Sequence, residues 1–268
     1  MQKLTLPFLA GVILSALMIA LLTSFSADLW EGWMPATCLE RGCFCEATNT
    51  TNAIRQVANT LSSLGFVFSG IFMLAYKRTD AKRLSAFYSA IIGIAVIIIG
   101  LGSGFYHASL TFTGQFTDVL GMFLLAAFML VYAWERIYKF QPRRTLGIYL
   151  AINVGLTWLQ IVVPETRRFI FALVLIIALI FEAVYRRKAQ PRITVRWIHL
   201  ASGLMILAYI IWILDNLRVV CFENSILQGH ALWHLLGAVS VWYLHKYYVS
   251  EEIITAGNAQ TASLAERS

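Results

Sequence analysis

The sequence predicts an all-α integral membrane protein, in which a bundle of seven transmembrane helices follows an additional N-terminal hydrophobic helix. Of its 268 residues, 59% are hydrophobic and only 13% are charged, and the mean hydropathy is +0.71. Such a chain cannot cover its surface with polar groups, which excludes a water-soluble globular protein. The apolar residues also lack the two-residue alternation of a transmembrane barrel strand, so we expect helical spans.

Eight apolar stretches are each long enough to cross the ~30 Å hydrocarbon core of a bilayer as a helix. They lie near residues 5–25, 57–76, 86–107, 116–134, 145–163, 169–185, 195–216 and 226–244. The first stretch also fits a signal peptide, because it has one lysine, an apolar run and small residues after it. Its apolar run is long for a signal peptide, which favours a retained anchor helix. The other seven stretches form the expected bundle.

The chain divides by composition into four parts. They are an N-terminal anchor helix or signal peptide (1–27), an extracytoplasmic loop with cysteines (28–56), a seven-helix membrane domain (57–250) and a tail (251–268). The tail is polar, rich in small residues and without apolar periodicity, so we expect it to be disordered in the cytoplasm. It carries no signal about function.

The basic residues indicate how the bundle is oriented, because short cytoplasmic loops collect lysine and arginine. The loops after the second, fourth and sixth stretches hold most of them: Lys77, Arg78, Lys82, Arg83, Arg136, Lys139, Arg143, Arg144, Arg186, Arg187, Lys188, Arg192 and Arg196. We therefore expect these loops and the C-terminus in the cytoplasm, and the loop 28–56 on the opposite side. The net charge of +7 is then a topology signal, since a nucleic-acid site would need basic residues clustered on a soluble face.

The four cysteines fall in loops that the charge pattern places outside the cytoplasm: Cys38, Cys43, Cys45 and Cys221. Their number is even and the compartment is oxidising, which predicts two disulfides. One would be local, and the other would join the first loop to the connection before the last helix. A structural zinc site at Cys43 and Cys45 is not favoured, because a single intervening residue is not the spacing of such sites.

Polar residues from separate stretches are expected at the same, extracytoplasmic depth of the membrane. Ser103 and His107 lie at the outer end of their helix, Asp118 begins the next one, and His230 and His234 lie in the first turns of the last. Asn59, Thr60 and Ser62 open the second stretch from the same side. Ionisable groups in hydrocarbon are costly, so a cluster of them indicates a functional site.

The residue types in this cluster fit a zinc hydrolase. His230 and His234 are four residues apart and share a helix face, and His107 would supply a third imidazole ligand. Three protein ligands leave a position for water, whose pKa falls toward ~7 on the metal. Asp118 could accept the proton of that water, and Ser103 could donate a hydrogen bond to the carbonyl oxygen under attack. The pattern therefore predicts hydrolysis of an amide or ester.

Each residue also has an ordinary structural interpretation. Two histidines on an apolar helix can be hydrogen-bonded core residues, and Asp118 at a helix start can be an N-cap. Ser103 between two glycines is typical of close helix packing. Only the joint placement of these residues favours the metal site.

Three blocks of residues resemble the alkaline ceramidases, a family of the CREST group of membrane hydrolases, which also includes adiponectin-receptor-like proteins. The blocks are Asn59-Thr60-Leu61-Ser62-Ser63, Gly102 to Leu110 with Gln115 and Asp118, and His230-Ala231-Leu232-Trp233-His234. Their order and spacing are similar to those of the family across residues 43 to 248. The resemblance implies a seven-helix bundle with zinc on His107, His230 and His234, assisted by Asp118 and Ser103. It also implies hydrolysis of the ceramide amide to a sphingoid base and a fatty acid.

The chain departs from the family in the loop before the second stretch. Animal members carry a calcium site there, which Glu46 fits. Cys43 and Phe44 stand where Asp and Trp are expected, and Gln56 stands where Glu is expected. These replacements leave calcium binding at Glu46 in question.

Two further points follow from the resemblance. Cys45 and Cys221 match a pair that the family joins by a disulfide, which leaves Cys38 with Cys43. Val119 replaces the acidic residue that follows the catalytic Asp in the family, so the substrate preference is expected to differ.

The expected function is therefore a zinc-dependent amidase acting on ceramide or a related long-chain N-acyl lipid. Its partner is a membrane lipid, which reaches a site within the bilayer laterally, and its location is a plasma membrane, or the inner membrane of a bacterium. The alternative is a non-catalytic lipid-binding or structural protein with a closed zinc site, for which Asp118 would be the fourth ligand. A transporter is not favoured, because the sequence shows neither an internal repeat nor broken helices.

Overall fold

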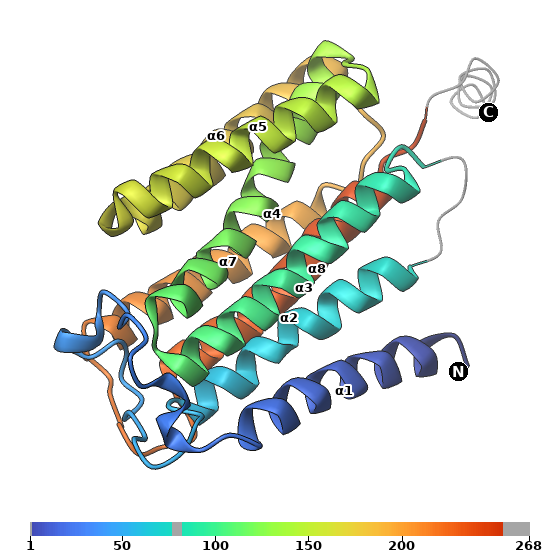
Figure 1. Ribbon diagram of the computed structural model, residues 1–268. Coiled ribbons are helices and arrows are strands. Elements are labelled where there is room, and N and C mark those ends of the chain that lie inside the picture. Colours follow the sequence, from blue (N-terminus) through green and yellow to red (C-terminus); the bar gives the residue numbers. More distant parts are fainter. Residues whose placement is uncertain (1, 77–81, 254–268) are drawn as a thin grey trace, which may run out of the picture.

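The computed structural model describes residues 2–76 and 82–253. Within these residues the chain forms eight α-helices and no β-strand (Figure 1). The helices are α1 (Gln2–Thr23), α2 (Val57–Ala75), α3 (Ala86–Ser109), α4 (Phe112–Tyr138), α5 (Pro142–Val162), α6 (Arg167–Ala189), α7 (Arg196–Asn216) and α8 (Gly229–Ser250). Each corresponds to one of the eight apolar stretches, which confirms the predicted fold class.

The length and apolar composition of its helices indicate that this is an integral membrane protein. In the described part of the chain, the seven helices from α1 to α7 are long and apolar enough to cross a membrane. Helix α8 has a similar length, but it carries His230, His234, His245 and Lys246, which lower its hydropathy. It lies inside the bundle nonetheless, packed against α2 and α7.

The bundle is built around the α2, α3, α4 and α8 helices. Helix α3 packs between α2 and α4, while α8 joins α2 to α7. The helices α5 and α6 pack on α4, and α1 packs on α2, so these two groups lie on opposite flanks of the bundle (Figure 1). All long helices run between the same two ends.

Small residues allow the closest helix contacts. A Cβ atom on Gly70 of α2 would lie 2.6 Å from the carbonyl oxygen of Gly93 on α3. A Cβ atom on Gly102 of α3 would lie 2.6 Å from the carbonyl oxygen of Thr117 on α4. Neither position has room for a side chain, so the glycines bring the backbones together, as in other membrane helix pairs. The second contact places the turn that carries Ser103 beside the turn that carries Asp118.

At one end of the bundle, here called the disulfide end, the loops 24–56 and 217–228 pack together (Figure 1). The disulfides join Cys38 to Cys43 and Cys45 to Cys221. This confirms the expectation of one local bridge and one bridge to the connection before the last helix. It also confirms the pairing that the family resemblance implied. The second bridge fixes the loop before α2 to the loop before α8.

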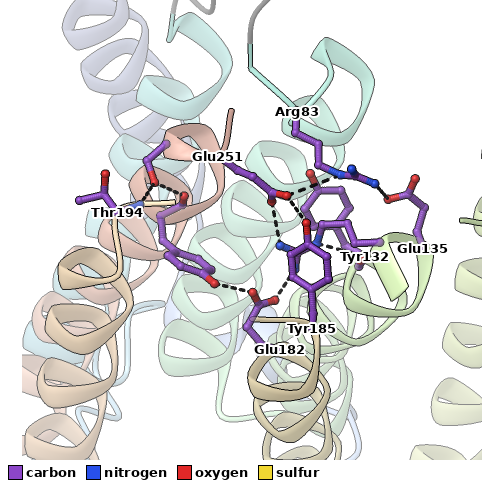
Figure 2. Close-up of polar contacts among 10 residues, drawn as sticks. Arg83, Tyr132, Glu135, Glu182, Tyr185, Thr194 and Glu251 are labelled. Carbon is purple, nitrogen blue, oxygen red and sulfur yellow. Dashed lines mark hydrogen bonds and ion pairs between the residues drawn. The ribbon is translucent and has the colours of Figure 1, made fainter. Parts of the chain in front are cut away.

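The opposite end buries a group of charges, here called the Arg136 cluster (Figure 2). Arg136 of α4 has a fully buried side chain that pairs with Glu182 of α6 and, at 3.0 Å, with Glu251 after α8. Its guanidinium lies 4.4 Å from the ring centre of Tyr132 and 4.3 Å from that of Tyr185. In Figure 2, Glu182, Tyr185 and Glu251 point toward one another from α6 and the end of α8. The cluster therefore joins three helices.

Two residues of the expected polar tail, Glu251 and Glu252, have partners elsewhere in the protein. Glu251 is buried, and its carbonyl oxygen accepts a hydrogen bond of 3.0 Å from the backbone N–H of Arg83. Glu252 pairs with Lys82 at 3.0 Å and donates its backbone N–H to the carbonyl oxygen of Arg192. Composition missed this because the partners of both residues lie in distant loops. The remainder of the expected tail, from residue 254, lies outside the described residues, as do Lys77 and Arg78.

Candidate metal centre

Three histidines come together at the disulfide end. His107 lies in the last turn of α3, and His230 and His234 lie in the first two turns of α8. All three are buried, and one ring nitrogen from each lies within 4.8 Å of the other two. The Nε2 atoms of His107 and His230 are 3.1 Å apart. Among the described residues this is the one group of histidine, cysteine and acidic side chains arranged to hold a metal ion.

The residue before α2 sets the orientation of His107. The Oε1 atom of Gln56 lies 2.8 Å from His107 Nδ1, and an amide oxygen can only accept a hydrogen bond. The proton is therefore on Nδ1, and Nε2 presents a lone pair to the other histidines. Gln56 is itself held, because its Nε2 donates to the backbone oxygen of Glu46 at 3.1 Å. This is the outer hydrogen bond that metal-binding histidines generally make.

His234 is oriented in the same way by α2. Ser62 Oγ lies 2.9 Å from His234 Nδ1 and donates its own proton to the backbone oxygen of Asn59 at 3.1 Å. The hydroxyl must then accept from Nδ1–H, which leaves the lone pair of His234 on Nε2. Ser62 was expected at this depth, and the structure gives it a specific partner.

His230 is fixed through its backbone. Its N–H donates to Oδ1 of Asp215 at 3.1 Å, and Oδ2 of the same carboxylate accepts from the N–H of Cys45 at 3.2 Å. Asp215 ends α7, so one side chain joins α7, the start of α8 and the disulfide loop. The ring of His230 stacks on Phe44, with ring centres 3.8 Å apart and an angle of 26° between the planes.

The donor set fits a zinc ion. In a tetrahedral site with Zn–N distances of about 2.0–2.1 Å, the nitrogen ligands lie roughly 3.4 Å apart. The Nε2 atoms of His107 and His230 are 3.1 Å apart, and all three ligand atoms lie within 4.8 Å of one another. Two of them carry lone pairs that Gln56 and Ser62 direct toward the shared space. Neutral imidazoles in this arrangement could hold the metal as three of its four ligands.

Ser103 and Asp118 lie beside the histidines but play different parts. Ser103 Oγ is 3.2 Å from Nε2 of His234, and the Asp118 carboxyl lies close to the same hydroxyl. Asp118 is outside the group of three ligands. The closed four-ligand site that would favour a purely structural zinc is therefore not the arrangement seen.

Asp118 does not begin its helix, contrary to the sequence expectation. Helix α4 starts at Phe112, and Thr111 caps it by accepting the N–H of Gly114 at 3.1 Å. Asp118 lies in the second turn, so it is not the N-cap. The cap at Thr111 starts the helix about one turn before residue 116, where the apolar stretch began.

Glu46, the candidate calcium ligand, caps α2. Its two carboxylate oxygens accept the backbone N–H groups of Ala58 at 2.7 Å and Asn59 at 2.9 Å. Burial raises the pKa of the Glu46 carboxyl above its ordinary value, although the backbone hydrogen bonds partly offset this effect. Helix N-termini favour negative charge, so the carboxylate has a structural role that does not require calcium.

Sequence reasoning missed Gln56, Phe44 and Asp215 as parts of the site. Gln56 and Phe44 were considered only as replaced calcium ligands. Asp215 is an acidic residue within an apolar, membrane-length stretch. Because such a placement costs free energy, it indicates a functional residue and could have identified Asp215 from the sequence.

Comparisons with known proteins match most of this chain to one family. The model of the Ceramidase family matches residues 43–265. The chain is 25% identical over 183 residues to "Putative alkaline ceramidase dcd3B" of Dictyostelium discoideum, which covers 59% of this chain and 62% of that protein. It is 23% identical over 243 residues to "Alkaline ceramidase" of Drosophila melanogaster, which covers 85% of this chain and 83% of that protein. The chain thus spans less than two thirds of the length of the first relative.

Proposed function

The chain belongs to the Ceramidase family, and we propose that it is a zinc-dependent amidase embedded in the membrane. Its substrate is ceramide or a related long-chain N-acyl lipid, which it hydrolyses to an amine, such as a sphingoid base, and a fatty acid. The observation that carries this proposal is the convergence of three buried histidine nitrogens from α3 and α8. The names of the two relatives support the choice of substrate.

Zinc held by three histidines supplies a Lewis acid that lowers the pKa of water to about 7. The chain's own residues supply the remaining chemistry. Asp118 accepts a proton from the attacking water and returns one to the leaving nitrogen, which makes it the general base and then the general acid. Ser103, beside His234 Nε2 at 3.2 Å, donates a hydrogen bond to the carbonyl oxygen as negative charge develops on it.

The position of the site supports a lipid substrate. The three histidines are buried within the helix bundle, so a lipid that moves laterally from the bilayer can reach them more easily than a water-soluble molecule. The basic residues lie mainly near the Arg136 end, where Lys82, Arg83, Arg143 and Arg144 flank α3 and α5. The disulfide end and the site then face outside the cytoplasm, and the C-terminus faces the cytoplasm.

The test is mass spectrometry of the fatty acids and amines released by purified protein in detergent. The panel contains ceramides, N-acyl amino acids and N-acyl ethanolamines, because the residues do not specify the head group. We expect release by the wild type and none by His234→Ala. His199→Ala is the matched control, since His199 is exposed on α7 and distant from the site in the sequence. Equal release by metal-free His234→Ala protein would refute the zinc mechanism, and no release from any lipid would refute the amidase.

A further inference from the structure

The three histidine rings are not held in the same way. The Nδ1 atoms of His107 and His234 each have a hydrogen-bond partner, Gln56 at 2.8 Å and Ser62 at 2.9 Å. The Nδ1 atom of His230 is buried and has no hydrogen-bond partner among the described residues. A free imidazole can rotate about its side-chain bonds, which would move Nε2 away from the other two ligands. With Nε2 facing His107 at 3.1 Å, the Nδ1 side of the His230 ring is therefore oriented by packing and not by a hydrogen bond.

Phe44 is the group that contacts the face of the His230 ring. The two ring centres are 3.8 Å apart and nearly parallel, while the ring centre of His107 lies 5.1 Å from that of Phe44. Phe44 is 5% exposed, although it belongs to a loop and not to a helix. Its side chain therefore covers two of the three histidines from the side of the disulfide loop.

The backbone of Phe44 is restrained on both sides. Cys43 is bridged to Cys38, and Cys45 is bridged to Cys221 in the loop before α8. The backbone oxygen of Phe44 accepts a hydrogen bond from Arg218 at 3.3 Å. The N–H of Cys45 donates to Asp215, the residue that also accepts the N–H of His230. The loop that carries Phe44 and the turn that carries His230 are thus fixed to one carboxylate.

We propose that Phe44 is a positioning residue for the metal centre, held by the two disulfides so that its ring fixes the third histidine ligand and covers the site on the loop side. This inference deepens the proposed function, because it rests on a metal ion bound by the three histidines. Phe44 orients the ring of His230, as Gln56 and Ser62 orient the rings of His107 and His234. An aromatic face is required for this, since an aliphatic side chain of similar size offers no flat surface for stacking.

The proposal has a consequence for metal exchange. Outer contacts that orient metal-binding histidines typically change metal affinity by about 10–100-fold when they are removed. Loss of the Phe44 ring should therefore speed metal release, and it should also open the site to chelators dissolved on the loop side. Removing the disulfides should act in the same direction, because they act through Phe44.

The experiment follows the release of Co²⁺ from purified full-length protein. The absorption of bound Co²⁺ reports the ligand geometry, and its decay after mixing with excess EDTA gives the release rate. The variants are Phe44→Leu, which removes the aromatic face, and Phe44→Tyr, which keeps it. Phe105→Leu is the matched control, because Phe105 packs at the same end against Trp30 and Trp33, with ring centres 5.7 and 6.3 Å away.

We expect Phe44→Leu to release Co²⁺ about tenfold faster or more and to change the absorption spectrum. Phe44→Tyr should behave like the wild type, and Phe105→Leu should lower the melting temperature without faster release. The double variant Cys45→Ser/Cys221→Ser, which leaves no free thiol of that bridge to bind metal, should also release faster. Combined with Phe44→Leu it should add little, because coupled residues are non-additive.

Release from Phe44→Leu at the wild-type rate would overturn the inference, as would equal acceleration by Phe105→Leu. A wild type that binds no Co²⁺ would also overturn it. These outcomes are separate from those of the amidase test, since release needs no lipid. If the wild type hydrolyses lipids but Phe44→Leu releases Co²⁺ at the wild-type rate, only the present inference fails. If Phe44→Leu releases Co²⁺ faster but the wild type hydrolyses no lipid, only the amidase proposal fails.

Discussion

Both ends of the bundle bury polar side chains from helices that are distant in sequence, but the two groups are built differently. In the Arg136 cluster a buried guanidinium meets two buried carboxylates, those of Glu182 and Glu251. At the disulfide end the ring nitrogens of three buried histidines, His107, His230 and His234, face one another. In the first group, the opposite charges form salt bridges with one another. In the second, one ring nitrogen from each of the three histidines converges on a shared point.

This difference teaches how a buried polar cluster in a membrane protein should be interpreted. Ionisable groups in hydrocarbon cost free energy and are often functional. Pairing of opposite charges within the protein also offsets this free-energy cost. The Arg136 cluster satisfies its charges internally, and Arg83 adds weaker pairs to Glu251 at 3.7 Å and Glu135 at 3.8 Å. Among the described residues, the histidine group is the one arranged to bind a metal ion. Variants at the two ends should therefore fail in different ways.

The largest effect is expected from Asp118→Asn at the disulfide end. The variant keeps a polar side chain beside Ser103 but loses the base, so turnover should fall by about 10²–10⁴-fold. The zinc content by elemental analysis and the melting temperature should stay close to the wild-type values. A loss of zinc together with activity would instead make Asp118 part of the metal site and would weaken the contrast between the two ends.

At the opposite end, Arg136→Met should lower stability and leave the metal centre intact. Removing the guanidinium takes the main cationic partner from two buried carboxylates and leaves Glu251 only the weaker pair with Arg83; breaking a buried pair in this way typically costs about 3–5 kcal/mol. We expect a lower melting temperature and an unchanged zinc content per folded protein. Arg187→Met, at an exposed position of α6, is the control and should change neither. An unaltered melting temperature in Arg136→Met would show that the cluster does not stabilise the bundle.

Gln56→Leu should have an intermediate effect on the metal centre. It removes the acceptor for His107 Nδ1, so metal affinity should fall by about 10–100-fold. Gln56→Glu keeps an acceptor oxygen and should lose less. The measurement is a competition titration with a chelator of known affinity. Equal affinities in the two variants would contradict the role of the acceptor and point to packing alone.

The smallest effect is the pH dependence of Glu46. Its folded-state pKa is raised above the unfolded value by burial, so it contributes stability below the unfolded pKa and loses this contribution as the pH rises through the folded pKa. Glu46→Gln lacks this titration. The melting temperature of the wild type should therefore rise relative to that of the variant as the pH falls from 7 toward 5. If the difference in melting temperature between the wild type and Glu46→Gln does not change with pH, the pKa of Glu46 is not raised by folding.

Much of the molecule could be predicted from its sequence, but not the contacts of particular side chains. The eight helices, the even set of cysteines and the depth of the histidines follow from local patterns. Gln56 illustrates the limit, because nothing in its neighbourhood indicates that its amide oxygen meets His107, 51 positions away. Glu251 illustrates it as well, since it resembles the start of a polar tail until its pairing with Arg136 is seen.

The sequence by itself determined that this is a helical membrane protein with a histidine-rich site and oxidised cysteines, because hydrophobic length, helix period and residue chemistry act over a few turns. Only the tertiary structure decided which ring nitrogens face one another, which charges neutralise each other and which aromatic ring covers the site. The physical reason is that lone-pair direction, ion pairing and ring stacking depend on distances of a few ångströms. Helix packing, close contacts at glycines and the long disulfide set those distances between segments far apart in the chain.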